Sequence, residues 1–119
     1  MNKYKELKVW QKSVALATDV YRLTKDFPSD ERFGLTSQIN RSVVSIASNI
    51  AEGSGRGTKK DFSRFLSIAY GSSYELETQM IISNNLKFLT PENFDRINCS
   101  IEEIQKMLFG LQKSLSTEN

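Results

Sequence analysis

The chain has 119 residues, 39% of them hydrophobic, and a net charge of +2, which suits one domain with one core over residues 1–119. It contains no histidine, so zinc sites, serine or cysteine triads and Glu-x-x-His di-iron bundles lack their central residue. We therefore expect no metal, no cofactor and no enzyme of these classes.

No apolar run approaches the roughly 18 residues that a membrane span needs, so we expect a soluble, cytoplasmic protein without a membrane partner. Cys99 is the only cysteine and cannot form an internal disulfide. A lone thiol in a reducing compartment usually serves as a small buried side chain, and we expect that role here.

The first predicted helix, residues 6–26, carries two apolar rows. One row comprises Leu7, Trp10, Val14, Ala17 and Tyr21, and the other comprises Val9, Leu16, Val20, Leu23 and Phe27. A helix with two apolar faces has more apolar surface than a single core position covers. The helix should end at Phe27, because a residue that precedes proline is pushed out of the α region.

The second predicted helix, residues 31–53, has either Ser29 or Asp30 as its N-terminal cap. Its apolar face consists of Leu35, Ile39, Val43, Ile46 and Ile50. A polar row flanks this face and consists of Gln38, Ser42, Ser45, Asn49 and Glu52. Periodicity alone favours solvated surface for the polar row, with a hydrogen-bonded seam against a neighbouring helix as the alternative.

The third predicted helix, residues 59–87, begins at a capping box formed by Thr58 and Asp61. Its main apolar row is Phe62, Phe65, Leu66, Ala69, Ser73, Leu76 and Met80. Tyr70, Tyr74 and Ile81 lie on a second side, and Ile68, Ile82 and Leu86 on a third. A helix that is apolar nearly all round should be enclosed on most sides.

The fourth predicted helix, residues 91–115, begins at Thr90, with Pro91 at its first position and an acid next to it. It carries a single apolar stripe of Phe94, Ile97, Ile101, Ile104, Leu108, Leu111 and Leu115. Strand-like alternation is sustained nowhere in the chain. Four helices with short connections predict an all-α, antiparallel up-and-down four-helix bundle.

The segment NIAEGSGRGTKK, residues 49–60, joins the second and third helices. It does not fit the phosphate-binding loop, because position 58 is threonine instead of glycine and helix instead of strand precedes it. Gly53 or Gly55 can close the second helix in the left-handed conformation. Basic residues gather beside the next helix N-terminus, whose free amides attract anions. These are Arg56, Lys59, Lys60 and Arg64, so we interpret the segment as a structural turn that carries a basic patch.

The run FPSDERFGLTSQINRSVVSIASNIAEGSGRGTKKDFSRFL, followed by IAYGSSYELET, closely resembles the bacterial four helix bundle protein family. This family is also called the 23S rRNA intervening-sequence protein family. The resemblance extends from LKVWQKS to KMLFGLQ, and it implies a four-helix bundle, a ring-shaped homopentamer and no enzymatic activity. Accessory proteins of diversity-generating retroelements look similar, and there a basic pentamer works with reverse transcriptase and nucleic acid.

The resemblance also singles out positions in this chain. They are Gln38, Arg41, Asn49, Glu52, Gly53, Gly55, Arg56, Gly71, Ser72, Glu75 and Glu77. Several belong to the polar row, and a seam of hydrogen bonds from Gln38, Asn49 and Glu52 to Glu75 or Arg56 is now favoured over solvated surface. The chain departs from its relatives at Ser42, where alanine is frequent, and at Asn40, where many carry a basic residue.

Two functions fit these observations. In the first, a non-enzymatic homo-oligomer binds RNA or DNA weakly, or serves a nucleic-acid-processing protein, through Arg41, Arg56, Lys59, Lys60 and Arg64. In the alternative, the homo-oligomer is a protein-interaction module without nucleic acid, which also explains the extra apolar surface. The two differ in whether the basic groups converge on one side.

A carboxylate enzyme that uses Glu52, Glu75 and Glu77 is disfavoured. Glu75 and Glu77 are two residues apart on a helix and therefore point to different faces. Glu52 would more commonly form an ion pair or hydrogen bond with Arg41 or Arg56.

Overall fold

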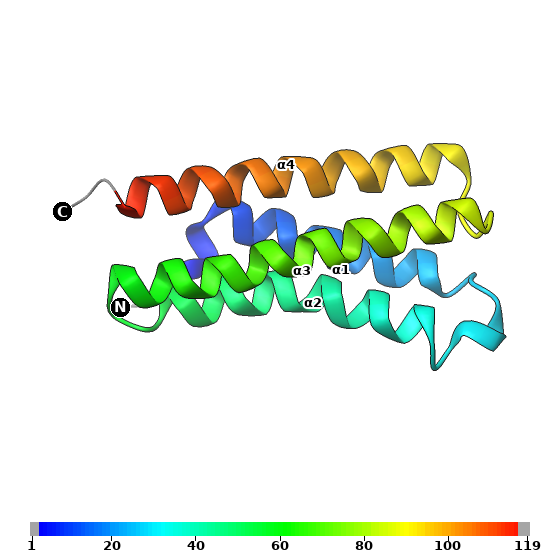
Figure 1. Cartoon of the computed structure of the whole chain (residues 1–119), viewed down its shortest axis with the longest axis horizontal. Coiled ribbons are helices and arrows are strands. Elements are labelled where there is room, and N and C mark those ends of the chain that lie inside the picture. Colours follow the sequence, from blue (N-terminus) through cyan, green and yellow to red (C-terminus); the bar gives the residue numbers. More distant parts are fainter. Residues whose placement is uncertain (1–2, 117–119) are drawn as a thin grey trace.

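The computed structural model describes residues 3–116, which form four α-helices, two short 3-10 helices and no strand. The α-helices are α1 (Lys8–Thr24), α2 (Leu35–Ser54), α3 (Lys59–Asn85) and α4 (Pro91–Ser116), and the short helices are η1 (Tyr4–Glu6) and η2 (Ser29–Glu31). The helices run up and down along a body 48 Å long (Figure 1). The all-α class predicted from the sequence is confirmed.

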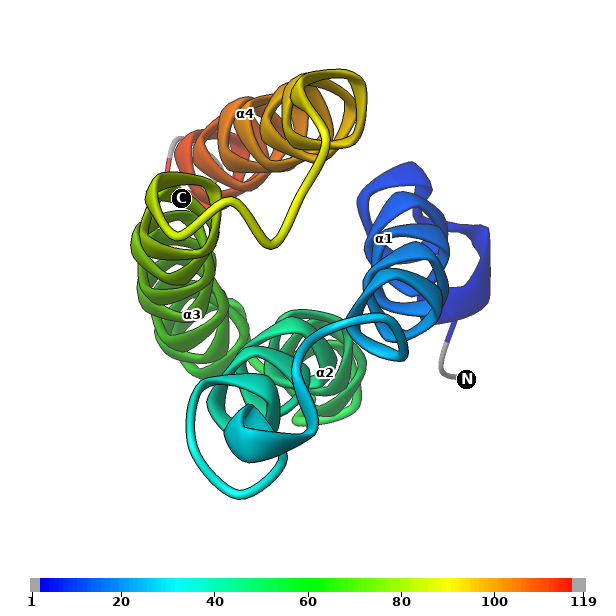
Figure 2. The ribbon, with the colours of Figure 1, turned by 90° about the vertical axis from the view of Figure 1, so that its right-hand side faces the viewer.

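Each α-helix packs against two others. α1 contacts α2 and α4, and α3 also contacts α2 and α4. Among the described residues no Cα atom of α1 comes within 8 Å of one in α3, nor one of α2 within 8 Å of one in α4, so the helices stand at the corners of a square (Figure 2). The bundle therefore has four faces, which we name α1–α2, α2–α3, α3–α4 and α4–α1.

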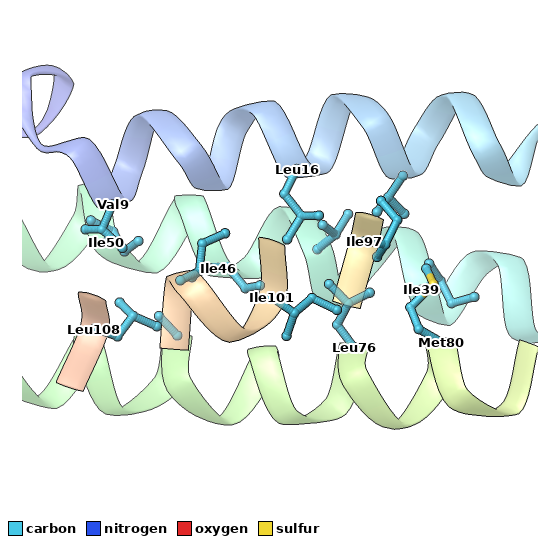
Figure 3. Packing of buried hydrophobic residues seen from close by; sticks show 14 of the residues in the cluster. Val9, Leu16, Ile39, Ile46, Ile50, Leu76, Met80, Ile97, Ile101 and Leu108 are labelled. Atoms are coloured by element: carbon cyan, nitrogen blue, oxygen red, sulfur yellow. The ribbon is translucent and has the colours of Figure 1, made fainter. Parts of the chain in front are cut away.

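The core lies along the axis of this square (Figure 3). Each helix contributes one row of buried apolar side chains, such as Leu16, Ile46, Leu76 and Ile101. The apolar stripe predicted for the fourth helix is this row in α4. Burial of such side chains contributes roughly 1.5–3 kcal/mol each and is the main source of stability.

The two apolar rows of α1 differ in burial. Val9, Leu16 and Val20 of one row are at most 4% exposed, so the chain buries them in its own core. In the other row Val14 and Tyr21 remain 38% and 45% exposed. Only this second row leaves apolar surface without a cover.

α3 also leaves apolar side chains uncovered, on its two outer sides. Its main apolar row is in the core, whereas Tyr74 is 51% exposed and the remaining large apolar residues are partly uncovered. These are Ile68, Ile81, Ile82 and Leu86, each between 43% and 53% exposed. The expected enclosure of α3 on most sides is not achieved within one chain.

α2 begins at Leu35, later than expected. Ser29 and Asp30 belong to η2, a 3-10 turn after Pro28, and neither caps α2. The Leu35 amide donates instead to a carboxylate oxygen of Glu31 at 3.4 Å. The expectation was wrong because serine and aspartate, which often cap an α-helix, also occur in a short 3-10 turn that precedes one.

The other two helix starts are as predicted. The Asp61 amide donates to Thr58 Oγ1 at 3.1 Å at the start of α3. The Asn93 amide donates to Thr90 Oγ1 at 3.1 Å at the start of α4. Each threonine oxygen thus satisfies one of the free amides of a first turn.

The glycines between α2 and α3 have other roles than predicted. Neither Gly53 nor Gly55 is left-handed, and the positive φ of 91° belongs to Gly57. Gly53 lies buried near the end of α2, where an added Cβ would stand 2.6 Å from the Cβ of Phe65 and 3.3 Å from the Phe62 carbonyl. Gly53 is therefore needed for the close approach of two helices and not for a left-handed cap.

Cys99 is exposed, which corrects the expected burial. It lies two residues after Ile97 on α4, and a helix turns about 200° over two residues. The side chain consequently points away from the buried stripe.

Candidate nucleic-acid interface

The up-and-down topology gathers three segments at one end of the bundle (Figure 1). Residues 3–12 lead into α1, residues 52–64 turn from α2 into α3, and residues 107–116 end α4. We name these three segments the basic end, because they hold nine basic and three acidic side chains. The basic ones are Lys3, Lys5, Lys8, Lys12, Arg56, Lys59, Lys60, Arg64 and Lys113, and the acidic ones are Glu6, Glu52 and Asp61.

The other end of the bundle has a balanced charge. Residues 19–38 and 84–96, which we name the opposite end, hold five basic and six acidic side chains. Both nitrogens of a bidentate pair, Nε and Nη2 of Arg96, lie 2.9 Å from the Asp19 carboxylate. Hydrogen bonding to Asp19 raises the pKa of Arg96.

At the basic end a hollow of about 380 Å³ opens between the start of α3 and the end of α4. Its rim combines three cations with three hydroxyls: Lys59, Lys60, Arg64, Ser63, Ser67 and Ser116. Gln112 Nε2 ties the two helices together there, donating to the Ser63 carbonyl at 2.9 Å and to Ser67 Oγ at 2.8 Å. Cations and hydroxyl donors near a helix N-terminus are groups that phosphate oxygens accept from.

Two arginines of the basic end are held in place by one aromatic ring. The guanidinium carbons of Arg56 and Arg64 lie 4.8 Å and 4.7 Å from the centre of the Phe65 ring. Arg56 also contacts Glu52 at 3.4 Å, and Arg64 contacts Asp61 at 3.7 Å. Both guanidinium groups are oriented by these contacts, yet both side chains remain about half exposed.

Arg41 does not join them. It lies 13 residues before the end of α2 at Ser54, a separation of about 20 Å along the helix at the helical rise. It borders a different hollow of about 450 Å³ on the α2–α3 face, together with Gln38, Ser42, Ser45 and Glu75. The structure thus brings four of the five basic candidates together and leaves Arg41 apart.

The polar row of α2 faces α3. The hydroxyls of Ser45 and Ser72 are hydrogen-bonded at 2.8 Å, and Asn49 Nδ2 donates to the Ser45 carbonyl at 2.8 Å. Gln38 and Glu75 share the α2–α3 hollow, but among residues 3–116 no hydrogen bond joins them. The hydrogen bond from this row to α3 is therefore that of Ser45 and Ser72, and of the expected seam the pair of Glu52 and Arg56 is present at 3.4 Å.

The three carboxylates considered for catalysis lie apart. Glu52 contacts Arg56, Glu75 borders the α2–α3 hollow, and Glu77 accepts from Gln105 of α4 at 3.2 Å. Within the described part of the chain no group of three His, Cys, Asp or Glu side chains could hold a metal ion. Gly71 is exposed, and an added Cβ there would meet nothing within 4 Å.

A groove on the α3–α4 face has aromatic walls. Tyr70 and Phe109 line a space of about 590 Å³ with Glu102, Gln105 and Lys106. The rings of Tyr70 and Tyr74 are 5.1 Å apart, and hydrogen bonding with Tyr74, more than partial burial, raises the pKa of Tyr70.

The corner at residues 56–64 is contiguous in the sequence, but its neighbours from α4 are not. Gln112 and Ser116 were not identified as neighbours of the corner, and Lys113 and the lysines of residues 3–12 were not identified as belonging to the same end. The predicted topology could have indicated this, because in an up-and-down bundle the chain start, the second corner and the chain end share one end.

Short connections, square packing and one core define this chain as an up-and-down four-helix bundle protein. Residues 5–110 match the family described as 23S rRNA-intervening sequence protein, and the chain belongs to that family. The resemblance found in the sequence is thereby confirmed.

One solved structure shares the fold across nearly its whole length. It is that of a protein with unknown function from the S23 ribosomal protein family of Bacteroides thetaiotaomicron VPI-5482. This chain is 30% identical to it, with a TM-score of 0.82, over 88% of this chain and 98% of the other. No curated protein matches the chain. No helix in residues 3–116 is long and apolar enough to cross a membrane.

Proposed function

We propose that this protein is a cytoplasmic, non-enzymatic scaffold that assembles with copies of itself and binds the phosphate backbone of RNA or DNA weakly through its basic end. The observation that carries the proposal is the charge imbalance of nine to three at this end. Backbone binding of this kind is largely independent of nucleotide sequence and weakens steeply as salt is added.

The imbalance points to function because folding does not require it. Crowded like charges repel one another and destabilise a compact state. The opposite end has the same number of residues and nearly equal numbers of acids and bases. A surplus of positive charge kept at one end is therefore better explained by a polyanionic partner.

Self-association would strengthen the attraction between the basic end and a nucleic acid. In a ring with parallel bundle axes, which we propose as a homopentamer on the family resemblance, the basic ends of all copies face the same side. A net charge of +2 per chain would become +10 for five chains. The resulting field would attract a polyanion that one copy holds weakly.

The test is binding of a structured RNA and of a duplex DNA across a salt series, followed by fluorescence anisotropy. Lys60→Glu/Arg64→Glu should lower the affinity about 10–100-fold and reduce the slope of log K against log salt by roughly 1.5–2. The matched control is Lys25→Glu/Arg32→Glu, which makes the same charge change at the opposite end.

The control variant should keep most of the wild-type affinity and slope. Equal losses in both variants would mean that only net charge matters and would remove the basic end from the proposal. No binding by the wild type at low salt would remove nucleic acid altogether.

A specific observation favours the alternative function, a homo-oligomeric protein-interaction module. Arg56 and Arg64 each face a carboxylate and the Phe65 ring, so part of their charge is already balanced. The partly uncovered apolar side chains of α1 and α3 also suit a protein partner. Retained self-association without any RNA or DNA binding would make this module the better account.

A further inference from the structure

The hollow of the basic end and the aromatic groove adjoin on the α3–α4 face. Ser67 borders the hollow and Tyr70 borders the groove, and they are three residues apart on α3, about 4.5 Å along the helix axis. From α4, Gln112 donates to Ser67 Oγ, and Phe109, which lines the groove, precedes Gln112 by one turn on the same side. We name the hollow and the groove together the α3–α4 track.

The groove part of the track has accessible aromatic rings from both helices. Tyr74 follows Tyr70 by one turn on α3, and their ring centres are 5.1 Å apart. Tyr74 is 51% exposed and Phe109 is 58% exposed, whereas Tyr70 is half-buried. The rings of Tyr74 and Phe109 can therefore be reached from solvent without a change in the fold.

The other exposed large apolar side chains of residues 3–116 have different surroundings. Tyr21 and Phe33 are 45% and 88% exposed, but both lie at the opposite end, and the Arg32 guanidinium already lies 5.2 Å from the centre of the Phe33 ring. At the basic end Tyr4 and Trp10 are half-buried and pack edge to face. The remaining exposed side chains of α3 are aliphatic and have no π face, namely Ile68, Ile81, Ile82 and Leu86. Exposed rings and a cluster of cations therefore meet on the α3–α4 track.

The two parts of the track differ in charge. The hollow is lined by three cations, namely Lys59, Lys60 and Arg64. In the groove Lys106 is accompanied by Glu102, and Glu77 accepts from Gln105, which also lines the groove. The hollow thus suits a phosphate, whereas the groove suits an uncharged planar group, since a second phosphate there would meet carboxylates.

A nucleotide in a single strand has both of these parts. Its phosphate is anionic, and its base is planar and uncharged, with amino groups that carboxylate oxygens can accept from. In a duplex the bases are paired and stacked on one another, so they do not reach a ring on a protein surface. In a single strand they are free to stack on aromatic side chains.

We propose that the α3–α4 track binds single-stranded nucleic acid, with a phosphate of the strand in the hollow and a neighbouring base stacked on the exposed rings of Tyr74 and Phe109. The inference rests on the proposed function and deepens it, because it adds base stacking to backbone binding. Base stacking on rings is tolerant of sequence, so the preference is for an unpaired strand and not for a nucleotide order.

The test compares three DNA ligands with equal numbers of phosphates, namely oligo(dT), an abasic strand and a hairpin duplex. Binding of each to the wild type is measured by fluorescence anisotropy at low salt. Oligo(dT) should bind about 5–100-fold more tightly than the abasic strand, because only oligo(dT) has bases that can stack on the rings.

The variant Tyr74→Leu/Phe109→Leu removes both exposed rings and keeps the apolar character of the two positions. Its affinity for oligo(dT) should fall about 5–100-fold, to that of the abasic strand. Its affinities for the abasic strand and the hairpin, and the slope of log K against log salt, should not change, because stacking releases no counterions.

The matched control is Tyr21→Leu/Phe33→Leu, which makes the same two residue changes at the opposite end. It should bind all three ligands as the wild type does. The four substituted positions are at least 45% exposed, so folding should be retained and is checked by circular dichroism. The mass in solution of both variants is measured by analytical ultracentrifugation and should equal that of the wild type.

The outcomes separate the inference from the proposed function. Equal wild-type affinities for oligo(dT) and the abasic strand, or an unchanged oligo(dT) affinity in Tyr74→Leu/Phe109→Leu, would overturn the inference. If Lys60→Glu/Arg64→Glu still weakened binding, the proposed function would stand. An equal loss in the control variant would remove the α3–α4 track from the inference.

Two further results would also contradict the inference. A changed mass in solution for Tyr74→Leu/Phe109→Leu would assign the groove to a contact between proteins instead of a nucleic-acid strand. No binding of any of the three ligands by the wild type would overturn the inference together with the nucleic-acid part of the proposed function.

Discussion

The two ends of this bundle are built from the same elements and differ in charge. Both hold helix termini and a threonine-capped helix start. At the opposite end acids balance bases, and Arg96 and Asp19 form a bidentate pair across two helices. At the basic end nine cations face three carboxylates. Arg56 and Arg64 pair with Glu52 and Asp61 within about one turn, and Lys12 pairs with Glu103 of α4 at 3.2 Å.

The difference shows which features serve the fold and which do not. Caps and buried apolar rows occur at both ends, so they are requirements of the bundle. The charge surplus occurs at one end and adds repulsion, so it is a feature that the bundle tolerates. Substitutions at matched positions can test whether the two ends differ in charge alone.

The largest effect is expected at the close contact behind the basic end. Gly53→Ala would place a Cβ 2.6 Å from the Phe65 Cβ, and both atoms are too close to their backbones to move freely. We expect a loss of about 2 kcal/mol in the free energy of unfolding, measured by urea denaturation at fixed protein concentration. The helices must separate there, since neither Cβ can rotate away.

Gly71→Ala is the matched control in α3. Nothing lies within 4 Å of its added Cβ, so the better helix propensity of alanine should raise stability by roughly 0.5–1 kcal/mol. The same change of residue thus has opposite signs at two sites. A neutral Gly53→Ala would mean that the corner can open and that the basic end is less rigid than the contact distance indicates.

The two helix caps should have equal effects despite the different charge around them. Thr58→Ala and Thr90→Ala each remove a hydrogen bond of 3.1 Å to a first-turn amide. Each should lower the free energy of unfolding by about 1 kcal/mol. Thr58→Ser and Thr90→Ser keep the oxygen and should restore most of the loss.

A clearly larger cost at Thr58 would show that the cap also holds the surrounding lysines and arginines in place. In that case the cap at Thr58 would fix the arrangement of the basic side chains as well as the start of α3. Equal costs would support the view that the two ends differ in charge alone.

The helices and the core rows could be predicted from the sequence because they depend on local periodicity. Thr58 and Thr90 were identified because capping residues act within one turn of themselves. Gly53 was misread because its role depends on Phe62 and Phe65 of another helix, and one sequence does not give the distance between helices.

The candidate interface was likewise predictable where it is local in the sequence and not where it depends on contacts between helices. The basic corner at Arg56, Lys59, Lys60 and Arg64 is contiguous and visible in the sequence. Its extension by Lys113 and the lysines before α1 depends on which segments the fold brings together. Hydrogen bonds of the polar row were misassigned to Gln38 and Glu75 because side-chain partners across helices depend on the exact register.

The smallest effect is expected where α3 ends, at the opposite end of the bundle. Lys87 has a φ of 64°, and the Phe88 and Lys87 amides donate to the carbonyls of Ser83 and Asn84 at 2.9 Å and 3.0 Å. This pattern closes a helix in the left-handed conformation, which glycine adopts without the steric cost of a Cβ. Lys87→Gly should therefore raise the free energy of unfolding by about 0.5 kcal/mol, after the greater chain entropy of glycine in the unfolded state is included.

Lys25→Gly provides the comparison, because Lys25 follows α1 with a φ of −59°, where a side chain causes no strain. There the same change should lower stability by roughly 0.5–1 kcal/mol. Urea midpoints of both variants give the sign directly, and a change in slope would reveal an altered unfolded state. If Lys87→Gly were destabilising, the Lys87 side chain would make a favourable interaction that outweighs its backbone strain.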